Sequence, residues 1–143
     1  MLIDIGGVKA YTMLDSGSTS DSLSPDFTQV AGLKVHTLAR PLNVQLGTVG
    51  SQSKINYGTS TRLKLGSVDE EYYFDVFNID RYDCILGIPF IRKFRLLLDL
   101  ANNSIIIDGK RHIALTTEED TVEQVRRSAS RIVSTSPETP EDQ

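Results

Sequence analysis

The fold and the function both depend on the segment Thr12-Met13-Leu14-Asp15-Ser16-Gly17-Ser18-Thr19-Ser20. In it an apolar strand runs directly into a carboxylate, which is followed by a hydroxyl residue and a glycine. A carboxylate at the end of a buried strand costs free energy unless it is paired or hydrogen-bonded. Two interpretations are open at this point. Asp15 either accepts backbone N–H groups in an ordinary strand-to-turn junction, or it is a functional carboxylate beside a glycine that lets another chain approach closely.

A second apolar segment lies further along the chain and reads Tyr82-Asp83-Cys84-Ile85-Leu86-Gly87-Ile88-Pro89-Phe90-Ile91. Its apolar residues and Gly87 predict the end of a buried strand, and Pro89 predicts a short helix over residues 89–94. Taken alone, the segment is also typical of any buried strand that ends in a turn.

Short strands dominate residues 1–115. The pair Gly6-Gly7 separates residues 2–5 from residues 8–14 and predicts a hairpin. A short helix begins at Ser24-Pro25 and ends near Gly32. Further strand-like runs, several of them bounded by glycines, cover residues 42–46, 53–57, 60–65, 72–77, 96–100 and 104–108. Several short strands at this spacing predict an all-β sandwich or barrel.

The charge distribution argues against nucleic acid as a partner. The chain of 143 residues carries 15 basic and 19 acidic residues. Residues 1–115 contain 12 of each sign, so the acidic excess lies in residues 116–143. A nucleic-acid-binding protein needs a concentrated basic face, which this pattern lacks.

Membrane insertion and secretion also lack support. No run of residues approaches the roughly 18 apolar residues that cross a bilayer. The N-terminal residues do not show the basic and apolar regions of a secretion signal. We therefore expect no membrane partner and a protein that is not secreted.

The sequence gives little support to metal or thiol chemistry. His36 and His112 are far apart, with no cysteine or carboxylate in ligand spacing beside either. Cys84, the only cysteine, lies in an apolar run typical of a buried thiol. Gly47 and Gly50 are not followed by the Lys-Ser/Thr of a phosphate loop. We therefore expect no metal and no cofactor.

Together, in this order and at this separation, the two segments resemble the retropepsin-like aspartic proteases, specifically the gag–pol protease of gypsy-type retrotransposons. The resemblance covers residues 2–108. It implies a closed β-barrel of the acid-protease fold with one short helix after Ile85-Leu86-Gly87. It also implies that Asp15 is the catalytic residue, that Ser16 and Gly17 support it, and that Ile85-Leu86-Gly87 packs beneath these residues.

The resemblance further implies a flap, which is a hairpin that closes over the substrate. It falls on residues 42–57, with Gly47-Thr48-Val49-Gly50-Ser51 at its tip, and the candidate substrate-binding residues are Ser18, Thr19 and Val49. Many retroviral members carry an Asp–Arg pair at the positions of Thr19 and Ile88. Both partners are absent here, so neither charge is left buried alone, and their joint absence favours the retrotransposon branch.

One chain supplies one catalytic carboxylate, whereas this chemistry uses two. The resemblance implies a homodimer in which Asp15 meets Asp15 of a second copy on a two-fold axis. In aspartic proteases two carboxylates about 3 Å apart share one proton. The ionised member activates a water that attacks the scissile carbonyl, and the protonated member donates to the carbonyl oxygen. The implied substrate is an extended segment of a retroelement polyprotein, cleaved inside the cell, in the cytoplasm or within virus-like particles.

Two other functions are open. Residues 15–20 also match a phosphodegron of the form Asp-Ser-Gly-x-x-Ser, which requires an accessible, flexible segment. Alternatively, the chain is a catalytically silent dimeric module that binds extended peptides without cutting them. The intact Asp15 favours the enzyme over the silent module.

The C-terminal residues differ in composition from the rest. We divide the chain into a protease domain (residues 1–115), an amphipathic helical extension (116–133) and a disordered acidic tail or linker (134–143). Thr116 and Glu119 form a capping box, and a helix over about residues 118–133 follows from apolar residues at helical spacing, namely Val122, Val125, Ala129, Ile132 and Val133. This apolar stripe packs on the protease body or adds to the dimer interface, unless the helix is the start of a linker.

Overall fold

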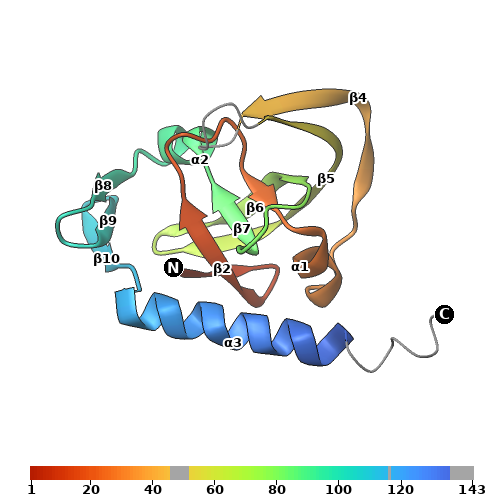
Figure 1. Cartoon of the computed structure of the whole chain (residues 1–143). Coiled ribbons are helices and arrows are strands. Elements are labelled where there is room, and N and C mark those ends of the chain that lie inside the picture. The colour runs from red at the N-terminus through yellow and green to blue at the C-terminus, as the bar shows by residue number, and fades with distance from the viewer. Residues whose placement is uncertain (46–51, 116, 136–143) are drawn as a thin grey trace.

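The computed structural model describes residues 1–45, 52–115 and 117–135, whose strands form two sheets (Figure 1). In chain order the elements are β1 (Leu2–Ile5), β2 (Val8–Leu14), β3 (Ser22–Leu23), α1 (Pro25–Val30), β4 (His36–Gln45), β5 (Gln52–Leu65), β6 (Val68–Val76), β7 (Cys84–Leu86), α2 (Ile88–Lys93), β8 (Leu97–Asp99), β9 (Ser104–Ile107), β10 (Lys110–Ile113) and α3 (Thr117–Thr135).

The larger sheet closes on itself as a barrel. Its strand order is β1-β2-β7-β3-β6-β5-β4, and β1 also pairs with β5, which closes the ring and leaves β4 outside it. β2 and β7 run parallel, whereas β3 and β7 run antiparallel. The predicted all-β, retropepsin-like closed barrel is confirmed.

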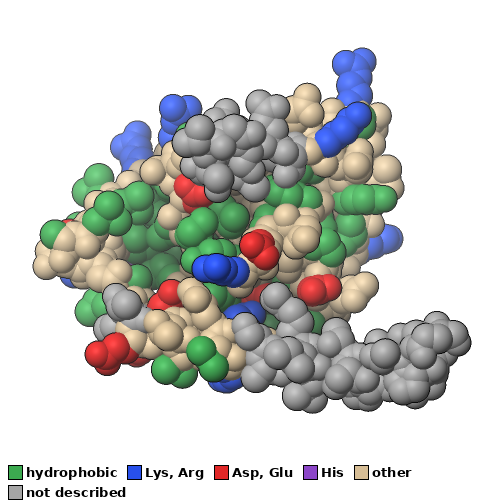
Figure 2. Space-filling view, in the orientation of Figure 1, with side chains coloured by type: hydrophobic (Ala, Val, Ile, Leu, Met, Phe, Trp, Pro, Cys, Tyr) green, Lys and Arg blue, Asp and Glu red, His purple; other side chains and the backbone are tan. Residues whose placement is uncertain are grey.

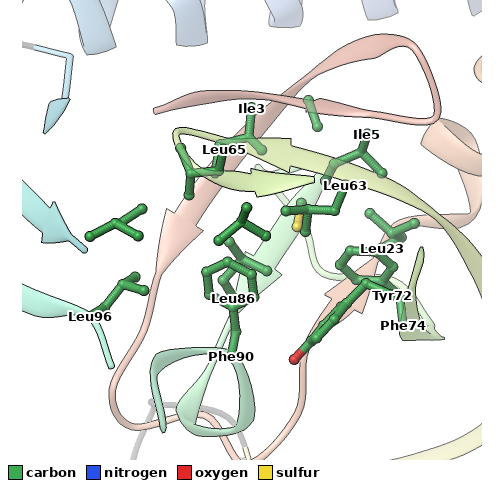
Figure 3. Packing of buried hydrophobic residues seen from close by; sticks show 14 of the residues in the cluster. Ile3, Ile5, Leu23, Leu63, Leu65, Tyr72, Phe74, Leu86, Phe90 and Leu96 are labelled. Carbon is green, nitrogen blue, oxygen red and sulfur yellow. The ribbon is translucent and has the colours of Figure 1, made fainter. Parts of the chain in front are cut away.

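A single hydrophobic core fills the barrel and extends under α2. In Figure 3, Ile3, Ile5, Leu63, Leu86 and Phe90 point into it, and each is at most 1% exposed. Aromatic contacts continue from Phe90 to Tyr72 of β6 with ring centroids 5.5 Å apart. α2 is therefore fixed against the barrel immediately after β7.

Three local signals in the sequence are confirmed. Gly6 and Gly7 form the hairpin turn with φ values of 61° and 84°, which glycine adopts without steric cost. Ser24 caps α1, because its hydroxyl accepts a hydrogen bond from the Phe27 N–H at 3.1 Å. The helix predicted after Gly87 is present as α2.

The strand break that the sequence analysis predicted near Gly58, between residues 57 and 60, is wrong. The runs 53–57 and 60–65 belong to one continuous strand, β5. A Cβ atom at Gly58 would lie 2.3 Å from the hydroxyl oxygen of Tyr73 on β6. Glycine at this position leaves room for the Tyr73 ring and does not form a turn.

The smaller sheet has the order β10-β9-β8 and includes a strand that we did not predict. β10 follows a tight turn at Asp108-Gly109, whose φ values are 51° and 76°. An Asp-Gly pair between two strands is a hairpin signal. The sequence therefore contained the information for this strand.

α3 begins and ends close to the predicted limits. It runs from Thr117 to Thr135, so residues 134 and 135 belong to the helix and not to the predicted tail; residues 136–143 lie outside the described part. Within the described ranges, no helix is long and apolar enough to cross a membrane.

Candidate active site

Asp15 lies in a loop that leaves the barrel directly after β2. Its backbone N–H donates to the Leu86 carbonyl at 2.9 Å, and its carboxylate Oδ1 accepts the Gly17 N–H at 2.9 Å. The side chain is half-buried, while Ser16 and Gly17 are exposed. Asp15 thus accepts a local N–H, as a turn residue does, and holds a half-buried carboxylate at the end of the barrel where β2 ends.

The segment Ile85-Leu86-Gly87 lies beneath this loop, as the resemblance implied. β7 pairs with β2 so that Ile85 is opposite Met13 and Leu86 is opposite Leu14. The next N–H, that of Ile88, donates to the Ser18 carbonyl at 2.8 Å. Two segments about 70 residues apart in sequence are therefore joined by hydrogen bonds on both sides of Gly87.

Gly87 has no room for a side chain. A Cβ atom there would lie 2.5 Å from the Ser20 carbonyl oxygen and 2.6 Å from the Ser18 carbonyl oxygen. Both contacts are with backbone atoms, so no rotation of a side chain relieves them. Glycine at this position is a requirement of the close packing between α2 and the Asp15 loop.

Asp21 is a site residue that the sequence analysis missed. It is 6% exposed, and its Oδ1 accepts N–H groups from Gly87 at 2.7 Å and from Phe90 at 3.3 Å. The Tyr72 hydroxyl donates to Oδ2. Burial raises the pKa of the Asp21 carboxyl, although its three hydrogen bonds oppose that shift. Asp21 ties the Asp15 loop to the start of α2, close to where retroviral members use the Asp–Arg pair.

The sequence around Gly87, which contacts Asp21, contained a signal for such a residue. Gly87 precedes α2 and has no side chain with which to cap it. The first N–H groups of a helix need acceptors, so an acceptor from elsewhere in the chain was required. Sequence spacing does not reveal which residue supplies it, because Asp21 is 66 positions from Gly87.

Ser18 and Ser20 are buried inside the loop. Ser18 is 0% exposed and its hydroxyl donates to the Ser20 carbonyl; Ser20 is 2% exposed and its hydroxyl donates to Asp75 at 2.6 Å. The position of Ser18 does not support the substrate-binding role predicted for it. The phosphodegron interpretation also fails, because a buried Ser20 is not available for phosphorylation.

Thr19 is exposed and lines a cavity of about 390 Å³ beside the loop. Tyr73 and Asp75 of β6 also line it, and the Tyr73 hydroxyl donates to Asp75 at 2.8 Å. The predicted flap residues Gly47, Thr48, Val49, Gly50 and Ser51 lie outside the described residues.

The described part of the chain offers no metal centre. No three side chains among its His, Cys, Asp and Glu residues converge in a way that could hold a metal ion. Cys84 is fully buried, and burial raises the pKa of its thiol well above the usual value. A thiol in this environment is a poor nucleophile.

Comparisons with known proteins agree with the retropepsin-like fold. A family model described as the PEG10/RTL1 protease domain matches residues 11–114. The crystal structure of the retroviral protease-like domain of Ddi1 from Leishmania major matches with a TM-score of 0.60 at 18% identity, and covers 83% of this chain and 96% of that one.

Curated relatives include two proteins of fungi. DNA damage-inducible protein 1 of Neurospora crassa is 26% identical over 108 residues, which are 76% of this chain and 24% of that protein. The UBA domain-containing protein Mud1 of Schizosaccharomyces pombe is 31% identical over 108 residues, which are 76% of this chain and 32% of that protein. The chain thus spans a quarter to a third of their length. Neither name is that of a retrotransposon protease, so the gypsy-type assignment stays a prediction.

Proposed function

The chain belongs to the PEG10/RTL1 protease domain family, and from this premise we propose that it is an aspartic endopeptidase in which Asp15 is the catalytic residue. The observation that carries the proposal is the placement of Asp15. Its half-buried carboxylate lies at the end of β2, between the exposed Ser16 and Gly17 and the barrel, and its backbone N–H donates to the Leu86 carbonyl at 2.9 Å. An acid fixed at a strand end and still partly exposed to solvent is suited to proton transfer to and from a bound peptide.

The reaction requires the Asp15 carboxylates of two copies. The ionised carboxylate takes a proton from a water molecule as the water attacks the scissile carbonyl carbon. The protonated carboxyl donates its proton to the carbonyl oxygen. As the tetrahedral intermediate collapses and its C–N bond breaks, the carboxyl that took the proton of the water donates it to the leaving nitrogen. The other carboxylate takes a proton from a hydroxyl of the intermediate, which becomes the new carbonyl, and the pair again holds one proton. Each step uses only carboxyl groups and water.

A surface between β2 and the smaller sheet is available for contact with a second copy of the chain. A cavity of about 310 Å³ is lined by Met13 and Leu14 of β2, by Leu98 and Ile105 of the smaller sheet, by Leu100 in the turn after β8, and by Asp120 of α3. Figure 2 shows hydrophobic side chains over β8 and β9 that continue toward the middle of this face. The exposed apolar side chains of this sheet and its turns are Leu97 (61% exposed), Leu98 (36%), Leu100 (87%) and Ile113 (73%). We propose that two copies pack here, with the β2 strands that lead into Asp15 next to each other.

Substitution of Leu100 tests this interface. Leu100→Asp places a charge in the apolar contact and is expected to weaken dimerisation by about 30-fold or more in Kd, which corresponds to about 2 kcal/mol. Val30→Asp is the matched control, because Val30 is 75% exposed on α1, on the other side of the molecule from β8–β10 (Figure 1). Sedimentation equilibrium measures the dimer Kd of both variants. Equal Kd values would show that β8–β10 are not part of the interface.

For substrate we propose an extended segment of a polypeptide, with the retroelement polyprotein as the specific case and the cell interior as the place of cleavage. An extended peptide pairs with exposed backbone, and its alternate side chains enter pockets. The exposed Thr19 and its cavity supply one such pocket.

Cleavage of a fluorogenic peptide library at about pH 4–6 tests the proposed function, since a shared-proton pair works in that range. We expect cleavage that a statine-type inhibitor blocks. Sedimentation of the same sample shows whether dimers are present. A confirmed dimer that cleaves nothing would contradict the enzyme and favour the silent peptide-binding module.

A further inference from the structure

α3 docks on the barrel through its polar face. Asp120, Gln124 and Arg127 contact the barrel, whereas Val122 and Val125 are 66% and 63% exposed. The predicted apolar stripe therefore points away from the protease body where the structure describes its side chains. A helix held in this way depends on ion pairs and hydrogen bonds more than on buried apolar area.

Arg127 is the centre of this contact. Its Nη2 lies 2.7 Å from Oδ2 of Asp83, and its guanidinium lies 4.9 Å from the ring centroid of Tyr11. The Tyr11 ring stacks in turn on Tyr82 at 5.0 Å. The Tyr11 hydroxyl donates to Asp120, and burial together with this bond raises the pKa of Tyr11 to about 12. Arg127 therefore reaches β2 and the residues just before β7.

Asp83 joins β2 to β7 at the end opposite to Asp15. Its carboxylate accepts the Tyr11 N–H at 2.9 Å, and its own N–H donates to the Tyr11 carbonyl at 2.9 Å. The Asp83 side chain is 17% exposed. A partly buried carboxylate is stabilised by a nearby cation, and Arg127 supplies one.

The paired region between β2 and β7 is short, so each end affects the other. Only three residue pairs separate the Asp83 contact from the Asp15 N–H···O bond to Leu86: Thr12–Cys84, Met13–Ile85 and Leu14–Leu86. A shift of β7 along β2 would move Leu86 and Gly87 relative to the Asp15 loop. Figure 1 shows α3 lying along the side of the barrel where β2 begins, away from the Asp15 loop.

We propose that Arg127 is a positioning residue for the candidate active site, and that it acts through Asp83 by fixing the register of β7 against β2. The inference rests on the proposed function for its catalytic consequence alone; the structural coupling stands without it. In this proposal α3 supports the candidate active site through Arg127, and is not only a linker.

The test compares Arg127→Met with Arg126→Met in the full chain. Arg126 and Arg127 both pair with Glu123, Arg127 through its Nε at 2.9 Å from Oε2, but the Arg126 side chain is 70% exposed and the ion pair with Asp83 is made by Arg127. Hydrogen exchange is measured by mass spectrometry on segments 12–17 and 83–90, with β5–β6 (residues 52–76) as the internal reference. We expect at least tenfold faster exchange in both segments for Arg127→Met, less than twofold for Arg126→Met, and an unchanged reference in both. Arg127→Lys, which keeps the charge, should recover part of the protection.

Kinetics and coupling complete the test. With a cleavable peptide, Arg127→Met should lower kcat by about tenfold with KM changed less than twofold. Asp83→Asn combined with Arg127→Met should add little to either single effect, because both act through one contact. Exchange equal to that of Arg126→Met, or faster exchange throughout β5–β6, would overturn the proposal. If the wild type cleaves no peptide, the proposed function fails. The hydrogen-exchange measurement still shows whether Arg127 fixes β7 against β2.

Discussion

Replacing Asp15 with asparagine is expected to lower kcat/KM for peptide cleavage by at least about 10⁴-fold, since the change removes both the general base and the general acid from a homodimer. The fold should survive. The side-chain oxygen of asparagine can still accept the Gly17 N–H, and the Asp15 N–H bond to Leu86 involves only backbone. Thermal unfolding and sedimentation of the variant check that fold and dimer are retained.

Asp26→Asn is the matched control for this experiment. Asp26 lies exposed in the first turn of α1 and is outside the candidate site. Its substitution removes the same charge without touching the Asp15 loop, so cleavage should be unchanged. Cleavage retained by Asp15→Asn at more than a few per cent of the wild-type rate would show that Asp15 is not the catalytic residue.

Replacing Asp21 with alanine is expected to lower the free energy of unfolding by about 3–5 kcal/mol, because buried donors then lose their acceptor. The donors are the N–H groups of Gly87 and Phe90 and the Tyr72 hydroxyl. Asp21→Asn should cost much less: its oxygen can serve both N–H groups, and its amide can donate to the tyrosine oxygen. Urea denaturation measures both variants, and equal losses for alanine and asparagine would contradict this account.

The stability gap between the wild type and Asp21→Asn should depend on pH. Burial raises the pKa of Asp21 above its usual value of 3.8, so the folded chain binds this proton more tightly than the unfolded chain. Ionisation of Asp21 therefore opposes folding, and the wild type loses stability relative to the variant as pH rises from below 3.8 through the raised native value. Urea denaturation of both proteins at about pH 3 and pH 7 measures this change in the difference of their free energies of unfolding. A wild type that gains stability relative to Asp21→Asn at pH 7 would contradict the prediction.

Much of the candidate site was predictable, because its signals are local. The apolar strand that ends in Asp15-Ser16-Gly17 and the segment Ile85-Leu86-Gly87 each carry their own pattern, and their order along the chain indicated the family. Gly6-Gly7 fixed the first hairpin through backbone conformation alone. The strand break predicted near Gly58 was wrong, because the sequence does not distinguish a glycine that ends a strand from a glycine that leaves room for a neighbouring ring.

Local patterns in the sequence predicted an all-β chain, its short helices and a carboxylate, Asp15, at the end of a strand, because alternation, turn residues and helix caps act within a few positions. The closed barrel and the catalytic role of Asp15 were implied by the resemblance to the retropepsin-like proteases. Only the tertiary structure decided which distant polar groups meet. Asp21 reaches Gly87 and Arg127 reaches Asp83 across the fold. The spacing of the valines predicted that α3 is a helix, but helical periodicity shows only which residues share a face, and not which face contacts the barrel. The polar face contacts the barrel because charged residues of the barrel pair with it, and no local pattern in the helix shows those residues.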